Sequence, residues 1–408
     1  MPTPVHDLEL PAVDLLGLER DEALAAFEAA AERHWIARMP LGYVVFRHED
    51  VTAILRDRRF HSAISLMNQM AGVSDTYLSE RQQKSILAME GPEHARLRRL
   101  VAPAFTPRSA DRLRPFMREV VDGLVDAFAA TGRCELVEDV CEPYPIPIVC
   151  ELLGAPKEDW KLFSAWATDI FRIFNNDLEN DLPKISAAFR ELDDYVRALI
   201  DERRSKPAAD LLSDLIAAEE AGDRLSTDEL VMMTEAVLMA GTDTTRNQLA
   251  CAVALFTDHP DQWARLAEQP ELAARAVEES MRMLGAVRGT ARFASEEIVY
   301  RDVLFPAGTL VATSLAAANV DRGVFDDALT FDTARETSAP QLTFGSGIHH
   351  CLGASLARAE LQEALPLLAR RMPDLALDGP IEWKPPTVGI WGPARLPLRF
   401  RTFAGQQP

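Results

Sequence analysis

An uninterrupted helical segment of about 32 residues constrains the fold of this 408-residue chain more than any other feature. Ser226 and Glu229 form a capping box, and apolar residues continue from there to His259 and Pro260. A helix of this length measures on the order of 48 Å at 1.5 Å per residue. Because it would cross a whole domain, we expect it at the centre of the fold.

The middle of this segment, from Ala240 to Thr245, reads AGTDTT. A glycine inside a helix costs about 1 kcal/mol relative to alanine, and β-branched threonines add a local penalty. Helix formation alone would therefore not select these residues. Two explanations stay open: Gly241 forms a notch for a closely packed neighbour, or the segment carries chemistry.

A glycine-rich turn holds Cys351 within residues 344–353, FGSGIHHCLG. Its glycines permit positive φ or a close approach of backbone, and the next residues, ASLARAELQEALPLLARR, favour a helix. We expect Cys351 at a helix N-terminus, where free N–H groups and the helix dipole lower the pKa of a thiol. Such a cysteine can be a nucleophile or the axial ligand of a haem iron, whereas a buried cysteine can also be a small hydrophobe.

This turn resembles the haem-binding loop of the cytochrome P-450 family, FGxGxHxCLG. The residues that match are Phe344, Gly345, Gly347, His349, Cys351, Leu352 and Gly353. The alternative, a cysteine protease, lacks its local cysteine signatures here. The resemblance extends from about Gly42 to Phe400 and implies haem b with Cys351 as the iron ligand.

The same resemblance implies the fold class, which is mainly α with a small β part (α+β). The long helix would lie over the haem and the cysteine loop beneath it. Length alone would suggest two or three domains, but no linker or repeat divides the chain, so we expect one domain over 1–408. The β-rich part is expected mainly at about 40–62, 290–315 and 378–400, with a hairpin turn at residues 306–308.

Helices are expected along most of the remaining chain, and residues 63–88 are expected to form a loop with short helices. The expected helical ranges are 20–36, 48–57, 91–105, 109–130, 138–153, 158–175, 184–204 and 271–284. A polar turn, NNDLENDLP, is expected between the last two helices before the long one.

In the long helix, Ala240 to Thr244 resembles the family segment A-G-x-D/E-T, which lies over the haem. The resemblance implies that Gly241 makes room for dioxygen beside Ala240. It also implies that Thr244 is the alcohol that orients protons toward the distal oxygen, and that Asp243 is the acid that relays them from solvent. Splitting an O–O bond requires two protons and two electrons, and a hydroxyl with a mobile carboxylate can supply the protons.

Four cationic side chains match family positions that bind the two haem propionates. His94 and Arg98 lie on one face of a helix, four residues apart, and match H-x-x-x-R. His349 stands two residues before the predicted ligand, and Arg292 lies in GTARFA. Outside these motifs, each would be read as an ordinary surface charge.

Glu279 and Arg282 match the family motif E-x-x-R, with Arg335 as the third member of the triad. An isolated pair at i and i+3 is usually a solvated ion pair of little energetic weight. In the family the triad locks the core on the side of the haem loop. We therefore predict a structural role and expect the loss of one partner to cost several kcal/mol.

The substrate site is expected to be an apolar pocket that holds one C–H bond near the iron. By analogy with the family, the candidate lining residues are Met67, Met70, Leu87, Phe171, Phe174, Val237, Ala240, Val287, Arg288, Ile390 and Trp391. The apolar ones could equally belong to the core. Arg288 would pair with an anionic group of the substrate, or else face solvent or a propionate.

The net charge of −20 argues against a nucleic-acid partner, because phosphate binding needs a basic face. No apolar run approaches the roughly eighteen residues of a membrane helix, and the start, MPTPVHDLELPAVD, lacks the features of a signal peptide. The five cysteines show no zinc spacing and no even pairing. We therefore expect a cytoplasmic protein with no membrane association.

No dinucleotide-binding G-x-G-x-x-G unit is present, so electrons would come from separate proteins, a ferredoxin and its reductase. Arg96, Arg99 and Arg358 would dock an acidic ferredoxin, and the protein is expected to be a monomer. The leading hypothesis is a haem-thiolate monooxygenase that acts on a hydrophobic small molecule. The alternatives are a peroxygenase on the same fold, a haem-based ligand sensor and a silent binding module.

Overall fold

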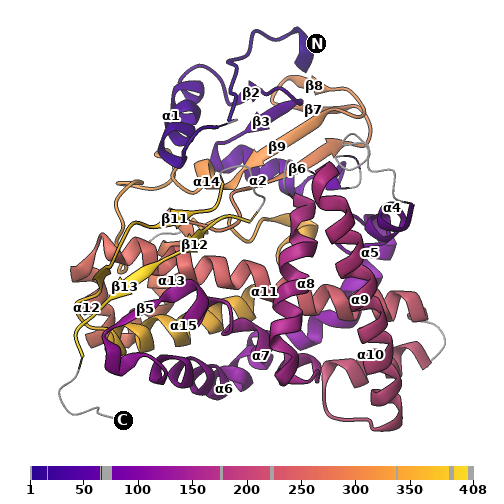
Figure 1. The fold of residues 1–408 in the computed structure, drawn as a ribbon. Coiled ribbons are helices and arrows are strands. Elements are labelled where there is room, and N and C mark those ends of the chain that lie inside the picture. The colour runs from indigo at the N-terminus through magenta and orange to yellow at the C-terminus, as the bar shows by residue number, and fades with distance from the viewer. Residues whose placement is uncertain are drawn as a thin grey trace.

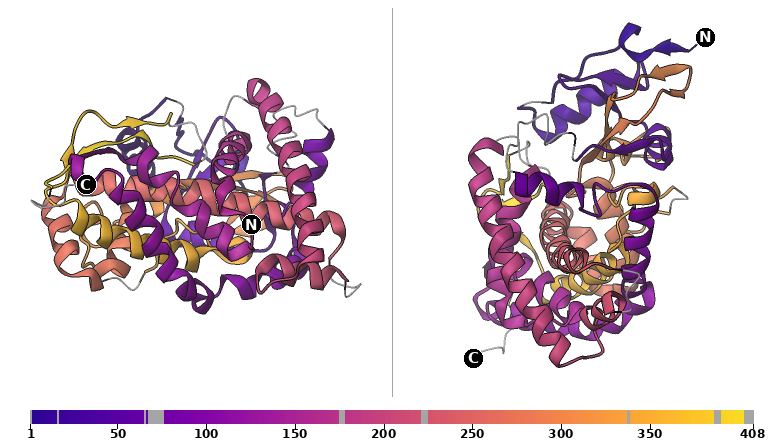
Figure 2. Two further views of the ribbon diagram at one scale, coloured as in Figure 1. Left: turned by 60° about the horizontal axis from the view of Figure 1, so that its bottom comes forward. Right: turned by 90° about the vertical axis from the view of Figure 1, so that its right-hand side faces the viewer.

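The predicted long helix is present as α11 (Thr227–Thr257), 31 residues long. Its capping box is confirmed, because the Ser226 hydroxyl accepts from the Glu229 N–H at 3.2 Å and the Glu229 carboxylate accepts from the Ser226 N–H at 2.8 Å. In the computed structural model, α11 crosses the helical part of the molecule (Figure 1). Viewed along its axis, it lies inside a ring of other helices (right panel of Figure 2).

The structure describes residues 2–15, 17–64, 66, 76–174, 178–220, 225–336, 339–385 and 390–402. The other α-helices are α1 (Arg20–Ala31), α2 (His48–Arg56), α4 (Thr76–Gln83), α5 (Gly91–Val101), α6 (Pro107–Asp126), α7 (Pro145–Leu153), α8 (Trp160–Ile170), α9 (Leu178–Ser205), α10 (Leu211–Glu220), α12 (Pro260–Glu268), α13 (Ala273–Met283), α14 (Leu315–Ala318) and α15 (Ala354–Arg371). Among the described helices, none is both long and apolar enough to cross a bilayer.

The β part consists of the strands β1 (Thr3–Pro4), β2 (Ile36–Arg38), β3 (Tyr43–Val45), β4 (Phe60–Ser62), β5 (Arg133–Glu135), β6 (Gly289–Ala294), β7 (Ile298–Tyr300), β8 (Val303–Phe305), β9 (Leu310–Ser314), β10 (Ala376–Leu377), β11 (Glu382–Trp383), β12 (Pro393–Arg395) and β13 (Pro397–Arg399). The largest sheet and the β1-β8-β7 sheet lie near the N-terminal end of the molecule, and two smaller sheets, β10-β13-β5 and β11-β12, lie away from it (Figure 1). The largest sheet has the order β2-β3-β9-β6-β4, in which only β3 and β9 run parallel. In its edge pair, Ser62 of β4 lies opposite Arg292 of β6.

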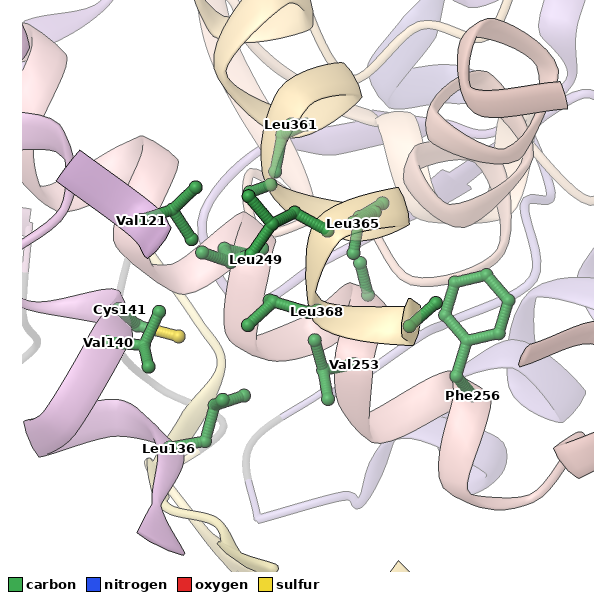
Figure 3. Close-up of a cluster of buried hydrophobic side chains, with 14 of the residues drawn as sticks. Val121, Leu136, Val140, Cys141, Leu249, Val253, Phe256, Leu361, Leu365 and Leu368 are labelled. Atoms are coloured by element: carbon green, nitrogen blue, oxygen red, sulfur yellow. The ribbon is translucent and has the colours of Figure 1, made fainter. Parts of the chain in front are cut away.

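The second half of α11 packs against α15 and the segment around residues 136–141. Figure 3 shows the apolar side chains that meet there, among them Leu249, Val253 and Phe256 of α11 and Leu361, Leu365 and Leu368 of α15. Burial of such a side chain stabilises the fold by about 1.5–3 kcal/mol. Because α15 follows directly after the cysteine turn, this core fixes Cys351 relative to α11.

Two predictions of local secondary structure are wrong. The hairpin turn lies between β7 and β8 at Arg301 and Asp302, which both have positive φ, and residues 306–308 instead carry the chain from β8 into another sheet. The polar segment predicted as a turn at 175–183 is helical from Leu178 onward, where α9 begins. Tertiary packing outweighs weak local preference in both places.

Candidate functional site

The cysteine turn is held against α2 by backbone geometry that only glycine adopts readily. Gly345 and Gly347 have φ of +68° and +73°, and a side chain on Gly347 would collide with the carbonyl oxygen of Leu55. The Cys351 N–H donates to the Phe344 carbonyl at 2.9 Å. The turn is thereby closed on itself, and its cysteine is held at a fixed place before α15.

Cys351 is an exposed residue, although protein atoms surround its thiol. Burial raises its pKa above the ordinary value of 9.0, and the Gly353 N–H with the charges of Arg98 and Arg358 only partly offset this effect. The predicted lowering of the pKa is therefore wrong, because burial by the rest of the fold outweighs the nearby N–H group and the arginine charges. A metal cation bound at the sulfur would remove the proton outright.

The four predicted propionate-binding residues come from three separate segments. α5 carries His94 and Arg98, β6 carries Arg292, and the cysteine turn carries His349. The rings of His94 and His349 lie 4.6 Å apart, and an Arg98 N–H donates to the carbonyl of His350. The structure therefore brings the α5 pair and the cysteine turn together.

These side chains fit a bound group that carries two carboxylates. Within the described residues, neither Arg98 nor Arg292 has a carboxylate within 4.0 Å, and burial lowers the pKa of both guanidinium groups. Nε2 of His94 is buried without a hydrogen-bond partner there. Burial, followed by the charges of His349 and Arg98, lowers the pKa of His94. Two anionic oxygens would satisfy these groups, as haem propionates do.

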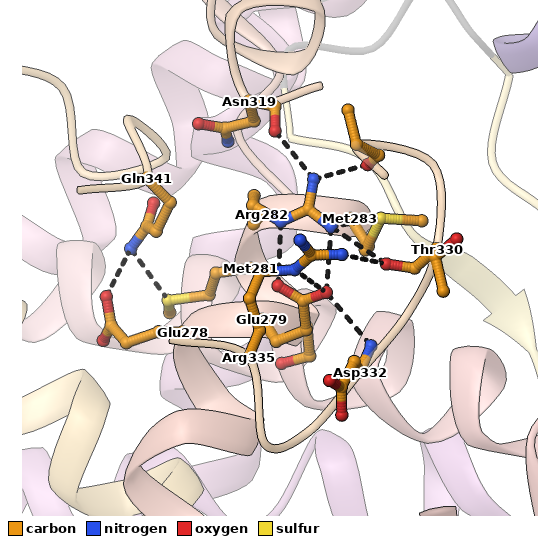
Figure 4. A network of polar contacts seen from close by, with 12 residues as sticks. Glu278, Glu279, Met281, Arg282, Met283, Asn319, Thr330, Asp332, Arg335 and Gln341 are labelled. Carbon is orange, nitrogen blue, oxygen red and sulfur yellow. Dashed lines mark hydrogen bonds and ion pairs between the residues drawn. The ribbon is translucent and has the colours of Figure 1, made fainter. Parts of the chain in front are cut away.

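The predicted triad forms, and its hydrogen bonds are saturated. Arg282 and Glu279 make two contacts of 2.8 Å, and Arg335 donates to the same carboxylate at 2.9 Å (Figure 4). Arg282 also donates to the carbonyls of Asn319, Ala328 and Thr330. The Arg282 and Glu279 side chains are 2% and 3% exposed, so this is a buried lock between α13 and the segment that leads to the cysteine turn.

In the middle of α11, Ala240 is exposed within an otherwise buried stretch, and Thr244 is half-buried. The Thr244 hydroxyl donates to the Ala240 carbonyl at 2.9 Å, which places it on the accessible face. Gly241 faces elsewhere, because a side chain there would collide with Val149 of α7. This close approach favours the packing-notch explanation for Gly241. The accessible face of α11 is formed by Ala240 and Thr244.

Asp243 lies against Arg246 at the wall of a cavity of about 290 Å³. Arg246 also reaches Glu142 at 3.5 Å, and both Asp243 and Arg246 are buried. Lys384 lines the same cavity and donates to the Asn247 side chain at 2.8 Å. Burial lowers the pKa of Lys384, and the charge of Asp243 partly offsets this. The acid of the acid–alcohol pair thus borders a cavity large enough for several water molecules, with both polar and apolar residues in its wall.

The predicted substrate residues are dispersed. Val287 and Ile390 are brought together by an antiparallel bridge, and Phe171 and Ile390 line the cavity beside Asp243. Val237 is buried among apolar side chains and Leu87 is 50% exposed. Met67, Met70 and the side chain of Phe174 lie outside the described residues.

Arg288 and Trp391 belong to one aromatic stack. The guanidinium of Arg288 lies 4.9 Å from the centre of the Trp391 ring, and Trp383 stacks on Trp391 at 4.5 Å between ring centres. Trp391 also packs with Cys251 and Leu284. Burial lowers the pKa of Arg288, so the structure supplies a structural role for it that the sequence did not suggest.

The three arginines predicted to dock an electron donor differ in their contacts. Arg99 is exposed. Arg96 is paired with Glu93 and Glu229, and Arg358 is paired with Glu278 and lies 4.5 Å from the centre of the Phe344 ring. Arg358 is therefore held over the cysteine turn rather than free at the surface.

The sequence reading missed three residues of this site. Arg246 could have been found, since it stands three residues after Asp243 on the same helix. Glu90, which contacts His349 at 2.9 Å, precedes the α5 motif directly, but its partner is 259 residues away. Lys384 carries no sequence signal, because only the tertiary fold brings it to α11.

Comparisons with known proteins agree with this geometry. A family model described as Cytochrome P450 matches residues 154–372. Luteothin monooxygenase of Streptomyces thioluteus is 37% identical over 374 residues, covering 91% of each chain. Nocardicin C N-oxygenase of Nocardia uniformis subsp. tsuyamanensis is 39% identical over 374 residues, covering 89% of this chain and 91% of that protein.

The fold also matches solved structures along nearly its whole length. The crystal structure of CalO2 superposes with a TM-score of 0.89 at 30% identity, covering 96% of this chain and 99% of the other. The range 154–372 matched by the family model contains the cysteine turn, the triad and α11. The structural similarity covers a larger share of the chain than that range.

Proposed function

We propose that this chain binds haem b through Cys351 and oxidises a hydrophobic substrate. The chain belongs to the cytochrome P450 family and is a haem-thiolate monooxygenase of small molecules. The observation that carries the proposal is the exposed residue Cys351 in a turn fixed by Gly345 and Gly347. When bound, haem supplies the activation of dioxygen and the transfer of one oxygen atom to the substrate.

His94, Arg98, Arg292 and His349 are proposed to hold the two propionates. The support is electrostatic: the half-buried guanidinium of Arg98 and the buried one of Arg292 have no carboxylate partner among the described residues, and the buried Nε2 of His94 has no hydrogen bond there. Removing a cation from water is costly unless an anion accompanies it. A dianionic cofactor would provide that compensation.

Asp243 and Thr244 are proposed to deliver protons. The carboxylate of Asp243 borders the cavity of about 290 Å³, while the Thr244 hydroxyl belongs to the accessible face of α11. Asp243 would take a proton from water in the cavity and pass it to the side of α11 where Thr244 stands. To pass the proton on, the Asp243 carboxylate must move away from Arg246. The nearby cation Lys384 then offsets the negative charge of that carboxylate.

Electrons are proposed to come from a ferredoxin and its reductase, and the protein is proposed to act as a cytoplasmic monomer of one domain. Exposed Arg99 and the arginine over the cysteine turn, Arg358, support an acidic donor on this side. The five cysteines are unpaired, as a reducing compartment would keep them.

The carbonyl spectrum of the reduced, haem-loaded protein tests the ligand assignment. We expect the red-shifted Soret band of a thiolate-ligated haem, and its loss in Cys351→Ala while Cys251→Ala retains it. An imidazole-type carbonyl spectrum from folded wild-type protein would contradict the proposal. Ligands that displace an iron-bound water and shift the Soret band would then identify the substrate class.

A further inference from the structure

Glu90 links the cysteine turn to the edge of the largest sheet. One of its carboxylate oxygens, Oε1, accepts from the backbone N–H of Ser62 at 2.6 Å and contacts Nε2 of His349 at 2.9 Å. The Glu90 side chain is 16% exposed and that of His349 is 11% exposed. These contacts are therefore largely shielded from water. A charge-assisted hydrogen bond is stronger in such a place than in solvent.

The three segments joined at Glu90 carry all four residues assigned to the propionates. Glu90 directly precedes α5, which holds His94 and Arg98. Ser62 is the register partner of Arg292 across β4 and β6. His349 belongs to the cysteine turn itself. One carboxylate thus ties together parts of the chain that are far apart in sequence and share only this site.

A purely local role for Glu90 does not account for these contacts. Glu90 occupies the N-cap position of α5, yet its side chain makes no capping hydrogen bond to that helix. Burial acts to raise its pKa, but the hydrogen bonds from His349 and Ser62 outweigh burial, and the pKa lies below the ordinary 4.5. The Glu90 carboxylate is therefore ionised at neutral pH. Its negative charge lies beside the residues that would bind the two negatively charged propionates.

We propose that Glu90 is a positioning residue for the haem, which fixes the His349 ring and holds the three cation-bearing segments in the arrangement that receives the propionates. This proposal rests on the proposed function. Contact of Nε2 with Glu90 leaves Nδ1 as the ring nitrogen that can face a propionate. The charges of Arg98 and Arg292 offset the repulsion between Glu90 and the propionates. Glu90 therefore favours haem binding by holding the site in its binding arrangement beforehand.

The test is the rate at which haem is lost from the loaded protein to an excess of apomyoglobin. Glu90→Ala is expected to speed haem loss about tenfold, the lower end of the effect of losing an outer partner of a bound group. Glu90→Gln should show a smaller effect, because its amide oxygen can still accept from Ser62. Glu93→Gln is the matched control, since Glu93 is an exposed neighbour paired only with Arg96 among the described residues, and it should leave the rate unchanged.

A double-mutant cycle separates positioning from general stability. In a His349→Ala background, Glu90→Ala is expected to speed haem loss by clearly less than tenfold, because only the contact with Ser62 is then left to lose. Haem loss equal to wild type in Glu90→Ala, or an undiminished effect in the His349→Ala background, would overturn the proposal. Neither result would affect the thiolate assignment, which the carbonyl spectrum tests by itself.

Discussion

Two pairs of carboxylate and arginine have the same spacing in this molecule and opposite surroundings. Glu279 and Arg282 lie at i and i+3 on α13, and Asp243 and Arg246 lie at i and i+3 on α11. Around the first pair, backbone carbonyls and Arg335 fill the remaining hydrogen-bonding positions. The second pair borders a cavity, and Oδ1 of Asp243 lacks a hydrogen bond of good geometry.

The difference separates a lock from a movable group. A saturated buried pair can change only by breaking many contacts at once, so it holds a structure in place. A pair beside a cavity that can hold several waters can exchange partners at a small cost, because water hydrates the carboxylate as the arginine leaves. The spacing of residues in the sequence is therefore not enough to assign a role; the surroundings decide it.

The largest effect is expected when the lock on α13 is broken. Arg282→Gln leaves the buried Glu279 charge without its bidentate partner, so we expect the free energy of unfolding to fall by about 3–5 kcal/mol and haem incorporation to fail. Denaturant unfolding and haem content per chain measure this. The control, Arg275→Gln on the same helix, removes an exposed pair with Glu336 and should cost less than about 1 kcal/mol. Equal losses in both variants would contradict the account.

Loss of the carboxylate on α11 should affect the rate and not the fold. Asp243→Asn is expected to slow turnover about a hundredfold, since general acid–base groups contribute 10²–10⁴-fold, while haem content stays at the wild-type level. Turnover per haem is the measurement. Asp228→Asn, on the exposed first turn of the same helix, should turn over normally. An Asp243→Asn enzyme as fast as wild type would exclude the relay.

A methyl group at position 241 should test the packing-notch explanation. Because a side chain on Gly241 would collide with Val149, Gly241→Ala is expected to cost about 1–3 kcal/mol of unfolding free energy. Combining it with Val149→Ala should restore part of the loss. If Gly241→Ala keeps full stability and instead weakens the binding of carbon monoxide, then the residue borders the gas-binding space and the packing explanation is wrong.

The smallest effect is expected at the arginine of the movable pair. Arg246→Gln is the same change as at Arg282, but water in the neighbouring cavity can hydrate Asp243, so we expect a loss of only about 1 kcal/mol in unfolding free energy. The same unfolding experiment measures both variants. A loss as large as that of Arg282→Gln would show that the two pairs are equivalent and remove the basis of the comparison.

The sequence predicted those parts of the molecule that local patterns specify. The capping box, the glycine turn around Cys351 and the triad follow from spacing and motif, and the structure contains all three. The pKa of Cys351 was predicted in the wrong direction, because the burial that opposes the helix terminus comes from the rest of the fold.

Contacts between distant segments were beyond the sequence. Nothing near Glu90 indicates that His349 and Ser62 would meet on its carboxylate, and nothing near Lys384 indicates a place beside α11. The apolar substrate candidates are dispersed in the structure and stay predictions, for a related reason. Apolar residues occur both in cores and in pocket walls. Only the tertiary structure shows which of them border a pocket.

The amount of product formed per dioxygen consumed by haem-replete Thr244→Ala tests the proposed division of roles most directly. The account predicts normal haem content and a fall in this ratio, with hydrogen peroxide appearing in place of product, because the hydroxyl that orients protons is gone. Thr234→Ala removes a buried hydroxyl with the same hydrogen bond to the preceding turn and should stay coupled. A fully coupled Thr244→Ala enzyme would contradict the assignment of proton delivery to the accessible face of α11.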